Sequence, residues 1–324
     1  MKKISDYAAE AEMALRAEKV QEKEPHSLYG PIDYALSSGG KRLRPGLLMM
    51  TAESYGGEAA LEASRKAAAG IEMFHNFTLL HDDVMDNSEM RRGRPSVFKE
   101  WDMNAAILSG DTMLTLATQL ISEVDDKKLR PVLDHFNEMA LEVYEGQRLD
   151  MDFETTDHIN SDTYIEMIRK KTGALLGASC AIGAIIGGAS EKDCNLMATF
   201  GNMLGIAFQI QDDWLDTYGD SSTFGKPIGG DILNDKKTFL LVKALEGEKS
   251  DTDALRVVMK ELKGEAKIKG VTKIYDKMGL NESTRQAVSY YSKQAIKALK
   301  GTSLSDEAKE PFRLLVEKLT GRKK

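Results

Sequence analysis

The sequence predicts an all-α protein with roughly ten or more helices in one domain. No proline occurs between Pro131 and Pro227, and apolar residues in that stretch recur every three or four positions. That period is typical of helices with one buried face, whereas a strand would alternate apolar and polar residues. No convincing alternation competes with it anywhere in the chain. These observations together favour a helical bundle.

Helical periodicity marks segments along the whole chain. In the first half it covers residues 8–20, 45–55, 59–83, 105–123 and 129–149, and in the second half 196–215, 239–245, 252–262, 283–299 and 306–319. Asn281, Ser283 and Ser305 are suitable N-caps for the last two. Length alone would allow about two domains. No linker, repeat or low-complexity segment marks a boundary, so we expect a single domain over residues 1–324.

Composition and charge exclude several classes of protein. The net charge of −7 argues against broad nucleic-acid binding, which needs a basic surface. Cys180 and Cys194 form neither a metal-like pair nor a disulfide framework, which fits a reducing compartment. The N-terminus lacks the apolar core of a signal peptide. The uncharged stretch at 174–190 is 17 residues long and broken by glycines, so it predicts a packed internal helix rather than a membrane span. We expect a cytoplasmic protein.

Two aspartate triplets carry the strongest chemical signal. Asp82, Asp83 and Asp86 end an apolar helical segment, and on a helix the first and last lie about 40° apart. Alone, such a triplet is more often a solvated helix end. The same spacing recurs 130 residues later in Asp212, Asp213 and Asp216. Two matched carboxylate faces favour a Mg²⁺ cluster, because Mg²⁺ binds carboxylates together with substrate phosphates. An EF-hand calcium site is excluded, because neither segment has the alternating ligands of that loop.

Basic residues accompany both triplets. Residues 39–45 read GGKRLRP, a glycine turn that leads into a helix, where backbone amides with Lys41 and Arg44 could hold a diphosphate. Arg91 and Arg92 follow the first triplet, and His75 precedes it by two helical turns. The remaining basic points are Lys170–Lys171–Thr172, Lys226 and Lys236–Lys237. Each alone is typical of a surface charge or an ion pair, but together they could neutralise two anionic substrates.

Seven motifs follow one another along the chain: GGKRLRP at 39–45, HDDVMDNSEMRRGRPS at 81–96, GDTML at 110–114, KKTGALL at 170–176, FQIQDDWLDTYGD at 208–220, FGKPIGGDI at 224–232 and KKT at 236–238. In this order they resemble the motifs of the trans-type isoprenyl diphosphate synthases, the polyprenyl synthetase family that includes short-chain farnesyl and geranylgeranyl diphosphate synthases. The resemblance covers about 200 residues and leaves the C-terminal third with little motif information.

The resemblance implies a helical bundle around a central cavity, usually homodimeric, that condenses isopentenyl diphosphate with an allylic diphosphate. It implies Asp82, Asp86 and Asp212 as magnesium ligands, with Asp83, Asp213 and Asp216 in support. Isopentenyl diphosphate would be held by Gly40, Lys41, Arg44, His75 and Arg92. The allylic diphosphate would be held by Arg91, Lys171, Thr172, Gln209, Lys226 and Lys236, among which Lys171 and Lys226 also assist catalysis.

Product length is predicted from the residues that precede the first triplet. Phe77 lies five positions and Phe74 eight positions before Asp82, so both project beside the carboxylate face. Ordinary core packing would explain them equally well. In the family, an aromatic residue at the position of Phe77 goes with short products. Thr78 is not aromatic, which favours geranylgeranyl (C20) over farnesyl (C15) diphosphate.

Two other functions compete with this interpretation. A terpene cyclase would share the fold and the first triplet, but it replaces the second triplet and lacks the GGKRLRP segment. A non-catalytic subunit of a heteromeric synthase would have lost one triplet, and both are intact here. An active enzyme is therefore the favoured prediction.

Overall fold

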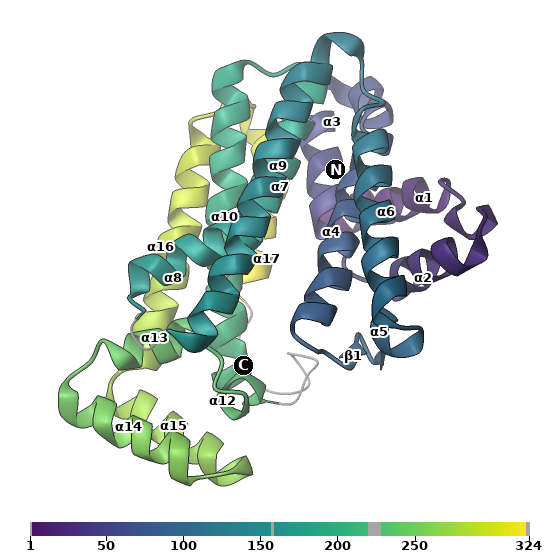
Figure 1. The fold of residues 1–324 in the computed structure, drawn as a ribbon. Helices are drawn as coiled ribbons and strands as arrows, with labels where there is room; N and C mark the ends of the chain where they lie inside the picture. The colour runs from purple at the N-terminus through teal and green to yellow at the C-terminus, as the bar shows by residue number, and fades with distance from the viewer. Residues whose placement is uncertain (1, 157–158, 220–227, 322–324) are drawn as a thin grey trace. The chain divides into compact units, whose positions relative to one another are not determined.

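The computed structural model describes residues 2–156, 159–219 and 228–321, and these are almost entirely helical (Figure 1). Backbone contacts divide them into two compact units. Unit 1 comprises the described residues of 1–138, 178–198 and 302–311. Unit 2 comprises those of 139–177, 199–301 and 312–324. The predicted all-α class with ten or more helices is confirmed.

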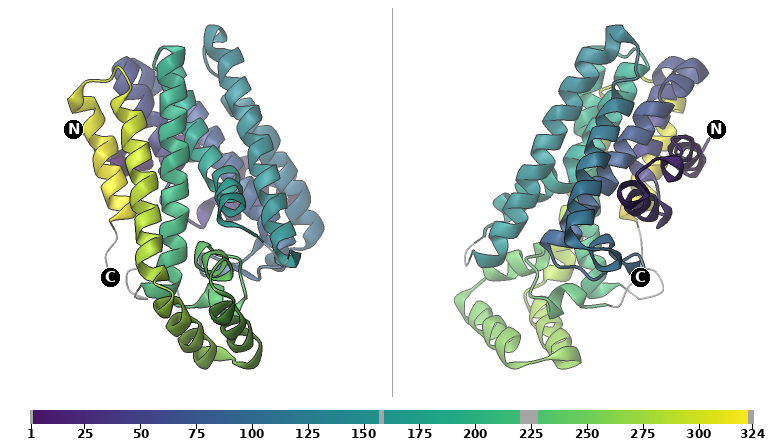
Figure 2. Two further views of the ribbon diagram at one scale, coloured as in Figure 1. Left: turned by 90° about the vertical axis from the view of Figure 1, so that its left-hand side faces the viewer. Right: turned by 45° about the vertical axis from the view of Figure 1, so that its right-hand side comes forward.

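Unit 1 is built on helices from the first third of the chain. They are α1 (Ile4–Arg16), η1 (Val20–Glu22), α2 (His26–Ser37), α3 (Leu43–Ala63), α4 (Arg65–Met85), α5 (Val97–Glu100) and α6 (Met103–Ile121). The first part of α7 (Asp126–Thr155) joins them. Helices α4 and α6 lie side by side in both views of Figure 2. Gly70 allows this close approach, because a Cβ there would lie 3.0 Å from the Ala117 carbonyl oxygen.

A short hairpin follows α4 in unit 1 and was not predicted. Strands β1 (Met90–Arg91) and β2 (Arg94–Pro95) pair antiparallel across a two-residue turn. Arg92 and Gly93 occupy that turn with φ of 53° and 78°, the left-handed geometry that suits the twist of a tight hairpin. The hairpin places Arg91 against Asp83 of the first triplet and Arg92 against the glycine turn at residues 39–40.

Unit 2 contains most of the remaining helices. They are the rest of α7, α8 (Ser161–Ile168), the π-helical turn η2 (Arg169–Gly173), α9 (Ala174–Ile186), α10 (Glu191–Tyr218), α12 (Gly230–Leu233), α13 (Phe239–Leu245), α14 (Lys249–Glu261), α15 (Gly264–Lys277), α16 (Leu280–Lys300) and α17 (Asp306–Thr320). From residue 178 onward α9 belongs to unit 1, as do the first turns of α10 and of α17.

Two hydrophobic clusters stabilise unit 2. One joins α8, α10, α13 and α16 through buried side chains that include Tyr164, Ile206, Ile210 and Phe239. The other packs the antiparallel pair α14 and α15 against α12 and α13, with Leu255 and Tyr275 at its centre. Figure 2 shows α14 and α15 beside each other. Tyr164 and Phe239 of the first cluster also donate hydrogen bonds to Asp213, so this cluster borders the second aspartate triplet.

For most predicted helices, at least one end lies within a few residues of the observed end. Residues 239–245 match α13 at both ends, and the glycine-rich stretch at 174–190 is a packed helix, α9. Helices α2 and α15 were missed. Both cysteines are buried thiols. Within the described ranges, no helix combines the length and hydropathy needed to cross a bilayer.

Candidate active site

The first aspartate triplet lies in the last turn of α4. Asp83 is only 3% exposed, and Arg91 of the hairpin donates two hydrogen bonds to its Oδ1, from Nε at 3.0 Å and Nη2 at 2.5 Å. Burial raises the pKa of Asp83 above its ordinary value, although Arg91 opposes that rise. Asp82 is half-buried and Asp86 is exposed at the C-cap. The Asp83 carboxylate is therefore occupied by Arg91, while the Asp86 carboxylate faces solvent.

A cationic cluster in unit 1 gathers several of the predicted isopentenyl diphosphate ligands. Arg44 Nη1 lies 3.2 Å from His75 Nε2. Burial and the neighbouring guanidinium groups of Arg44 and Arg92 hold the pKa of His75 well below 6.5, so the imidazole is neutral. Because arginine can only donate, His75 Nε2 accepts and its proton resides on Nδ1. His75 thus orients Arg44 without adding charge.

The glycine turn before α3 brings Arg92 into the same cluster. Gly39 and Gly40 have φ of 76° and 144°. A Cβ on Gly40 would lie 3.0 Å from the Arg92 guanidinium, and Arg92 donates a hydrogen bond to the Gly39 carbonyl oxygen. Lys41 is exposed beside this turn. The turn and the hairpin therefore present cations from two segments at one place.

Arg42 has a structural role in the same segment. It is 5% exposed and pairs with Glu72 and Glu12 at 2.6 Å each. A buried guanidinium needs such partners, because an unpaired charge in the interior is costly. This explains why GGKRLRP contains one basic residue that the predicted ligand set does not use.

The π-helical turn in unit 2 positions Lys171 and Thr172. A π turn adds one residue to the helical repeat and often occurs at functional sites. Gly146 of α7 makes room for it, because a Cβ there would lie 2.3 Å from the Lys171 backbone nitrogen. Gly205 of α10 allows a similar approach to Gly173, at 2.5 Å from its Cα. Two glycines thus let neighbouring helices pack tightly against the widened turn.

A hydrogen-bonded chain then connects this turn to the second triplet. Thr172 Oγ1 donates to Gln209 Oε1 at 3.2 Å, and Gln209 Nε2 donates to Asp213 Oδ1 at 3.1 Å. Lys171 Nζ pairs with Asp150 Oδ2 of α7 at 2.6 Å. The structure therefore brings together three of the predicted allylic diphosphate ligands. Asp150 was missed, because its pairing with Lys171 of another helical segment arises only in the fold.

Asp213 is the best-anchored carboxylate of the second triplet. It is 2% exposed, and its Oδ2 accepts from the Tyr164 hydroxyl at 2.5 Å and from the Phe239 amide at 2.9 Å. Burial raises the pKa of Asp213 to about 6, and the Phe239 and Tyr164 donors oppose that rise. Tyr164 was also missed, because its hydroxyl meets Asp213 only in the fold.

Asp216 of the second triplet and Lys236 both interact with Asp231. The Asp231 amide donates to Asp216 Oδ2 at 3.0 Å, and burial and the nearby Asp231 charge raise the pKa of Asp216 to about 6. Lys236 Nζ lies 3.8 Å from Asp231 Oδ1. Burial alone would lower the pKa of Lys236, but Asp231 and Asp213 raise it, so the amine stays charged. Lys236 is therefore a permanent cation beside the triplet.

The two triplets belong to different units: Asp82, Asp83 and Asp86 to unit 1, and Asp212, Asp213 and Asp216 to unit 2. Lys226 lies outside the described residues. Within the part of the chain that is described, no group of three His, Cys, Asp or Glu side chains already converges as a metal site. The donor set still fits Mg²⁺, which prefers carboxylate oxygen and needs only one or two protein carboxylates besides water and phosphate.

The predicted chain-length residues are packed together on α4. Phe74 is fully buried, with ring centroids 5.5 Å from Phe77 and 5.4 Å from Phe136. Phe77 is 5% exposed and also contacts His81, at 4.9 Å between ring centroids. Thr78 donates to the His75 carbonyl oxygen. Phe74 therefore supports Phe77 from the core, and Phe77 presents the more accessible ring.

Comparison with known proteins identifies close relatives. Residues 25–278 match the family model described as polyprenyl synthetase. A short chain isoprenyl diphosphate synthase from Methanothermobacter thermautotrophicus is 34% identical over 316 residues, which cover 97% of this chain and 96% of the relative. A geranylgeranyl diphosphate synthase from Sulfolobus acidocaldarius is 38% identical over 306 residues, 92% of this chain and 91% of the relative. The crystal structure of a geranylgeranyl pyrophosphate synthase matches with a TM-score of 0.93 and 39% identity over 100% of both chains.

Proposed function

Because the chain belongs to the polyprenyl synthetase family, we propose that it is a short-chain trans-prenyltransferase that joins isopentenyl diphosphate head to tail to an allylic diphosphate. One observation carries this proposal. Within its own unit, each aspartate triplet lies beside cations that suit a diphosphate: Arg91 in unit 1 and Lys236 in unit 2. Carboxylates and cations side by side match a metal-bound diphosphate.

The isopentenyl diphosphate site is assigned to unit 1. Arg44 and Arg92 supply charge from two segments, and Lys41 adds an exposed amine at the glycine turn. The buried Nε of Arg44 has no partner among the described residues, so one donor is left for a ligand. Neutral His75 keeps Arg44 in place. This arrangement binds the nucleophilic substrate by charge alone, without a metal ligand among its residues.

The allylic diphosphate site is assigned to residues of unit 2, and Arg91 of unit 1 is assigned to the same ligand from the resemblance alone. Thr172 donates a hydrogen bond to Gln209, the adjacent Lys171 pairs with Asp150, and Lys236 stays charged near Asp213. These groups would stabilise the negative charge that accumulates on the departing diphosphate. Lys226 is assigned here from the resemblance alone.

Magnesium would be held by Asp82, Asp86 and Asp212, and it would supply Lewis-acid neutralisation of the leaving diphosphate. Asp83 and Asp213 act differently, because their carboxylates accept hydrogen bonds from Arg91 and Tyr164. We assign them to positioning the triplet helices. Asp216 likewise holds the segment that carries Lys236.

The reaction proceeds by loss of diphosphate from the allylic substrate. The C1–O bond breaks and the oxygen keeps the electron pair, which leaves an allylic cation. The double bond of isopentenyl diphosphate attacks C1 and forms the new carbon–carbon bond. The positive charge moves to C3 of the isopentenyl unit. C2 then loses a proton, its C–H electrons form the new C2–C3 double bond, and the released diphosphate is a suitable proton acceptor. Lys171 and Lys236 act in the first step by stabilising the leaving group.

The product is proposed to be geranylgeranyl diphosphate, with farnesyl diphosphate as the alternative. Phe77 limits chain growth, and its ring is fixed between Phe74 and His81. A fixed aromatic ring gives a defined stop, because a growing chain cannot displace a side chain that packs on two sides.

A homodimer is proposed from the exposed face of α6. Met103, Ile107 and Leu108 are 54%, 42% and 59% exposed, an apolar group that a second copy would cover. Leu108→Glu should shift the particle mass measured by light scattering from dimer to monomer. A wild-type protein that is monomeric at micromolar concentration would disprove this assignment.

Incubation of purified protein with radiolabelled isopentenyl diphosphate and C5, C10 or C15 allylic diphosphates tests the function. We expect a C20 product that disappears when EDTA removes Mg²⁺. A cyclised hydrocarbon from an allylic diphosphate alone would indicate a cyclase instead. No product with any primer would indicate a subunit that needs a partner.

A further inference from the structure

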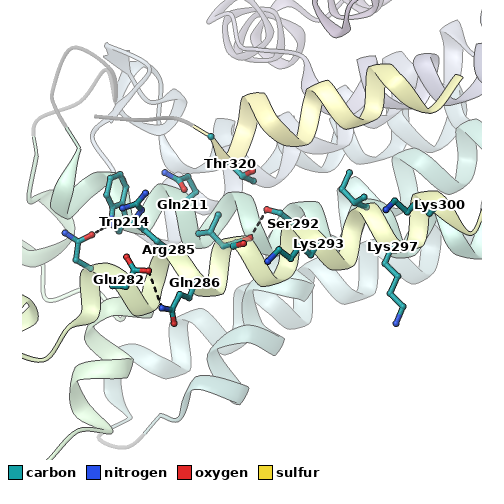
Figure 3. A pocket seen from close by; sticks show the side chains of 15 residues that line it. Gln211, Trp214, Glu282, Arg285, Gln286, Ser292, Lys293, Lys297, Lys300 and Thr320 are labelled. Carbon is teal, nitrogen blue, oxygen red and sulfur yellow. Dashed lines mark hydrogen bonds between the residues drawn. The ribbon is translucent and has the colours of Figure 1, made fainter. Parts of the chain in front are cut away.

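Unit 2 contains a cavity of about 1060 Å³ that includes none of the predicted site residues (Figure 3). Gln211 and Trp214 of α10 form its floor, α16 forms a long side, and the end of α17 at Thr320 borders it. Figure 3 shows Trp214 and Arg285 at one end and Lys300 at the other. Pockets for small ligands are typically about 300–1000 Å³. This cavity is therefore large enough for an extended molecule.

The side formed by α16 is strongly cationic. Arg285, Lys293, Lys297 and Lys300 all line the cavity and are exposed, and none of them forms an ion pair with another described residue. The single carboxylate in the lining, Glu282, accepts a hydrogen bond from Gln286. In a chain with a net charge of −7, this is a local excess of positive charge.

Helix stability does not explain all of these cations. Lysines near a helix C-terminus interact favourably with the helix dipole, which accounts for Lys297 and Lys300. Arg285 and Lys293 lie further from that end. Lys293, Lys297 and Lys300 also follow one another at spacings of four and three residues, where like charges repel. An anion in the cavity would relieve that repulsion.

The apolar part of the lining is already ordered. Trp214 is 4% exposed and Val288 is 5% exposed, and both line the cavity. The indole nitrogen of Trp214 donates to Asn281 Oδ1 at 3.0 Å, and its ring lies 5.9 Å from that of Tyr218. Two contacts hold the indole in place, so an apolar ligand would meet a preformed surface at little entropic cost.

We propose that this cavity is a second, non-catalytic binding site for a prenyl diphosphate of the kind the enzyme makes. The inference rests on the proposed function, which supplies that ligand. The diphosphate would bind Lys293 and Lys300, which lie seven residues and therefore about 10 Å apart along α16. The prenyl chain would extend over Val288 toward Trp214. Three lysines toward the end of α16, with Trp214 and Val288 beside Arg285 toward the other end, match this amphiphile better than they match inorganic diphosphate.

Occupancy of the cavity would act on the catalytic helix. Gln211 and Trp214 directly flank Asp212 and Asp213 in the sequence of α10. A ligand that contacts the flanking residues therefore contacts the helix that carries the second triplet. The expected consequence is inhibition by accumulated product that added isopentenyl diphosphate does not relieve.

Binding can be measured without catalysis, because the chain has two tryptophans. In a Trp101→Phe background, the fluorescence of Trp214 reports the cavity. Geranylgeranyl diphosphate is titrated in EDTA with saturating isopentenyl diphosphate, which withholds the metal and fills the other site. We expect saturable quenching, which geranylgeraniol and inorganic diphosphate reproduce only at far higher concentration.

Charge reversal tests the location of the site. The pair Lys293→Glu and Lys300→Glu should weaken binding by about tenfold or more, since two charge-assisted contacts become repulsive. Lys249→Glu with Lys263→Glu reverses two exposed lysines of unit 2 outside the cavity and should leave affinity unchanged. The cavity variant should keep the wild-type initial rate of elongation and lose product inhibition.

Three results would overturn the proposal: equal affinity in both pairs of variants, quenching that requires Mg²⁺, or product inhibition that survives in the cavity variant. The proposed function is tested separately, since elongation is measured in the wild-type protein at low product. Absence of elongation with intact Mg²⁺-independent quenching would disprove the function and leave the site.

Discussion

Removal of the Tyr164 hydroxyl should change the pH dependence of the enzyme. Tyr164 donates at 2.5 Å to Asp213, and burial has already raised the pKa of that carboxyl to about 6. The hydroxyl stabilises the ionised carboxylate, so Tyr164→Phe must raise the pKa further. A hydrogen bond to a charged group contributes about 1.5–3 kcal/mol, and 1.36 kcal/mol corresponds to about one pKa unit. The expected rise is roughly one to two units.

The pH–rate profile of kcat/KM for the allylic substrate measures this shift. In the wild type, activity should fall as pH decreases through about 6, because Asp213 and Asp216 become protonated. In Tyr164→Phe that acidic limb should move to higher pH, and activity at pH 7 should fall with it.

Tyr7→Phe is the matched control. Tyr7 donates to Glu53 at 2.5 Å in unit 1, so its loss removes a tyrosine–carboxylate hydrogen bond away from the second triplet. Its profile should match the wild type. An unshifted acidic limb in Tyr164→Phe, or the same shift in both variants, would refute the role of Tyr164 in holding an ionised Asp213.

Three further predictions follow from individual contacts. Gly146→Ala places a Cβ 2.3 Å from the Lys171 backbone nitrogen, so it should lower the free energy of unfolding measured in urea by about 1–3 kcal/mol. Gly30→Ala is the control and should leave that free energy unchanged, because its Cβ meets only the His26 side chain. Phe77→Ala should shift the product distribution toward longer chains in a chromatographic assay, and an unchanged distribution would remove Phe77 from that role. Asp212→Ala should nearly abolish turnover while the helical circular dichroism is kept, and activity restored by excess Mg²⁺ would contradict its assignment as an essential ligand.

The sequence alone predicted the fold class and most helices, because long amphipathic segments have an unambiguous period. It missed α15, where the lysines and the two glycines, Gly264 and Gly270, obscure the apolar face of the helix. It also missed α2, which contains Gly30 and Pro31. The hairpin after α4 was missed because its strands have two residues each and no pattern to detect.

The candidate site was predictable in its charges but not in its contacts. Two matched aspartate triplets can be predicted from spacing, because the first and last aspartates of each triplet are four residues apart and lie on the same face of their helix. Which aspartate of a triplet is hydrogen-bonded to the protein depends on partners far away in the sequence. Tyr164, for example, lies 49 residues from Asp213. The widened turn at Lys171 likewise depends on Gly146 of another helix. Such pairings arise only when the helices pack.

The most direct test of the central claim counts diphosphate released for each isopentenyl unit incorporated, by phosphorus NMR with product analysis on the same sample. Head-to-tail condensation predicts one diphosphate per new carbon–carbon bond, and none when either isopentenyl diphosphate or Mg²⁺ is omitted. Release of diphosphate from the allylic substrate alone, without chain extension, would contradict the assignment.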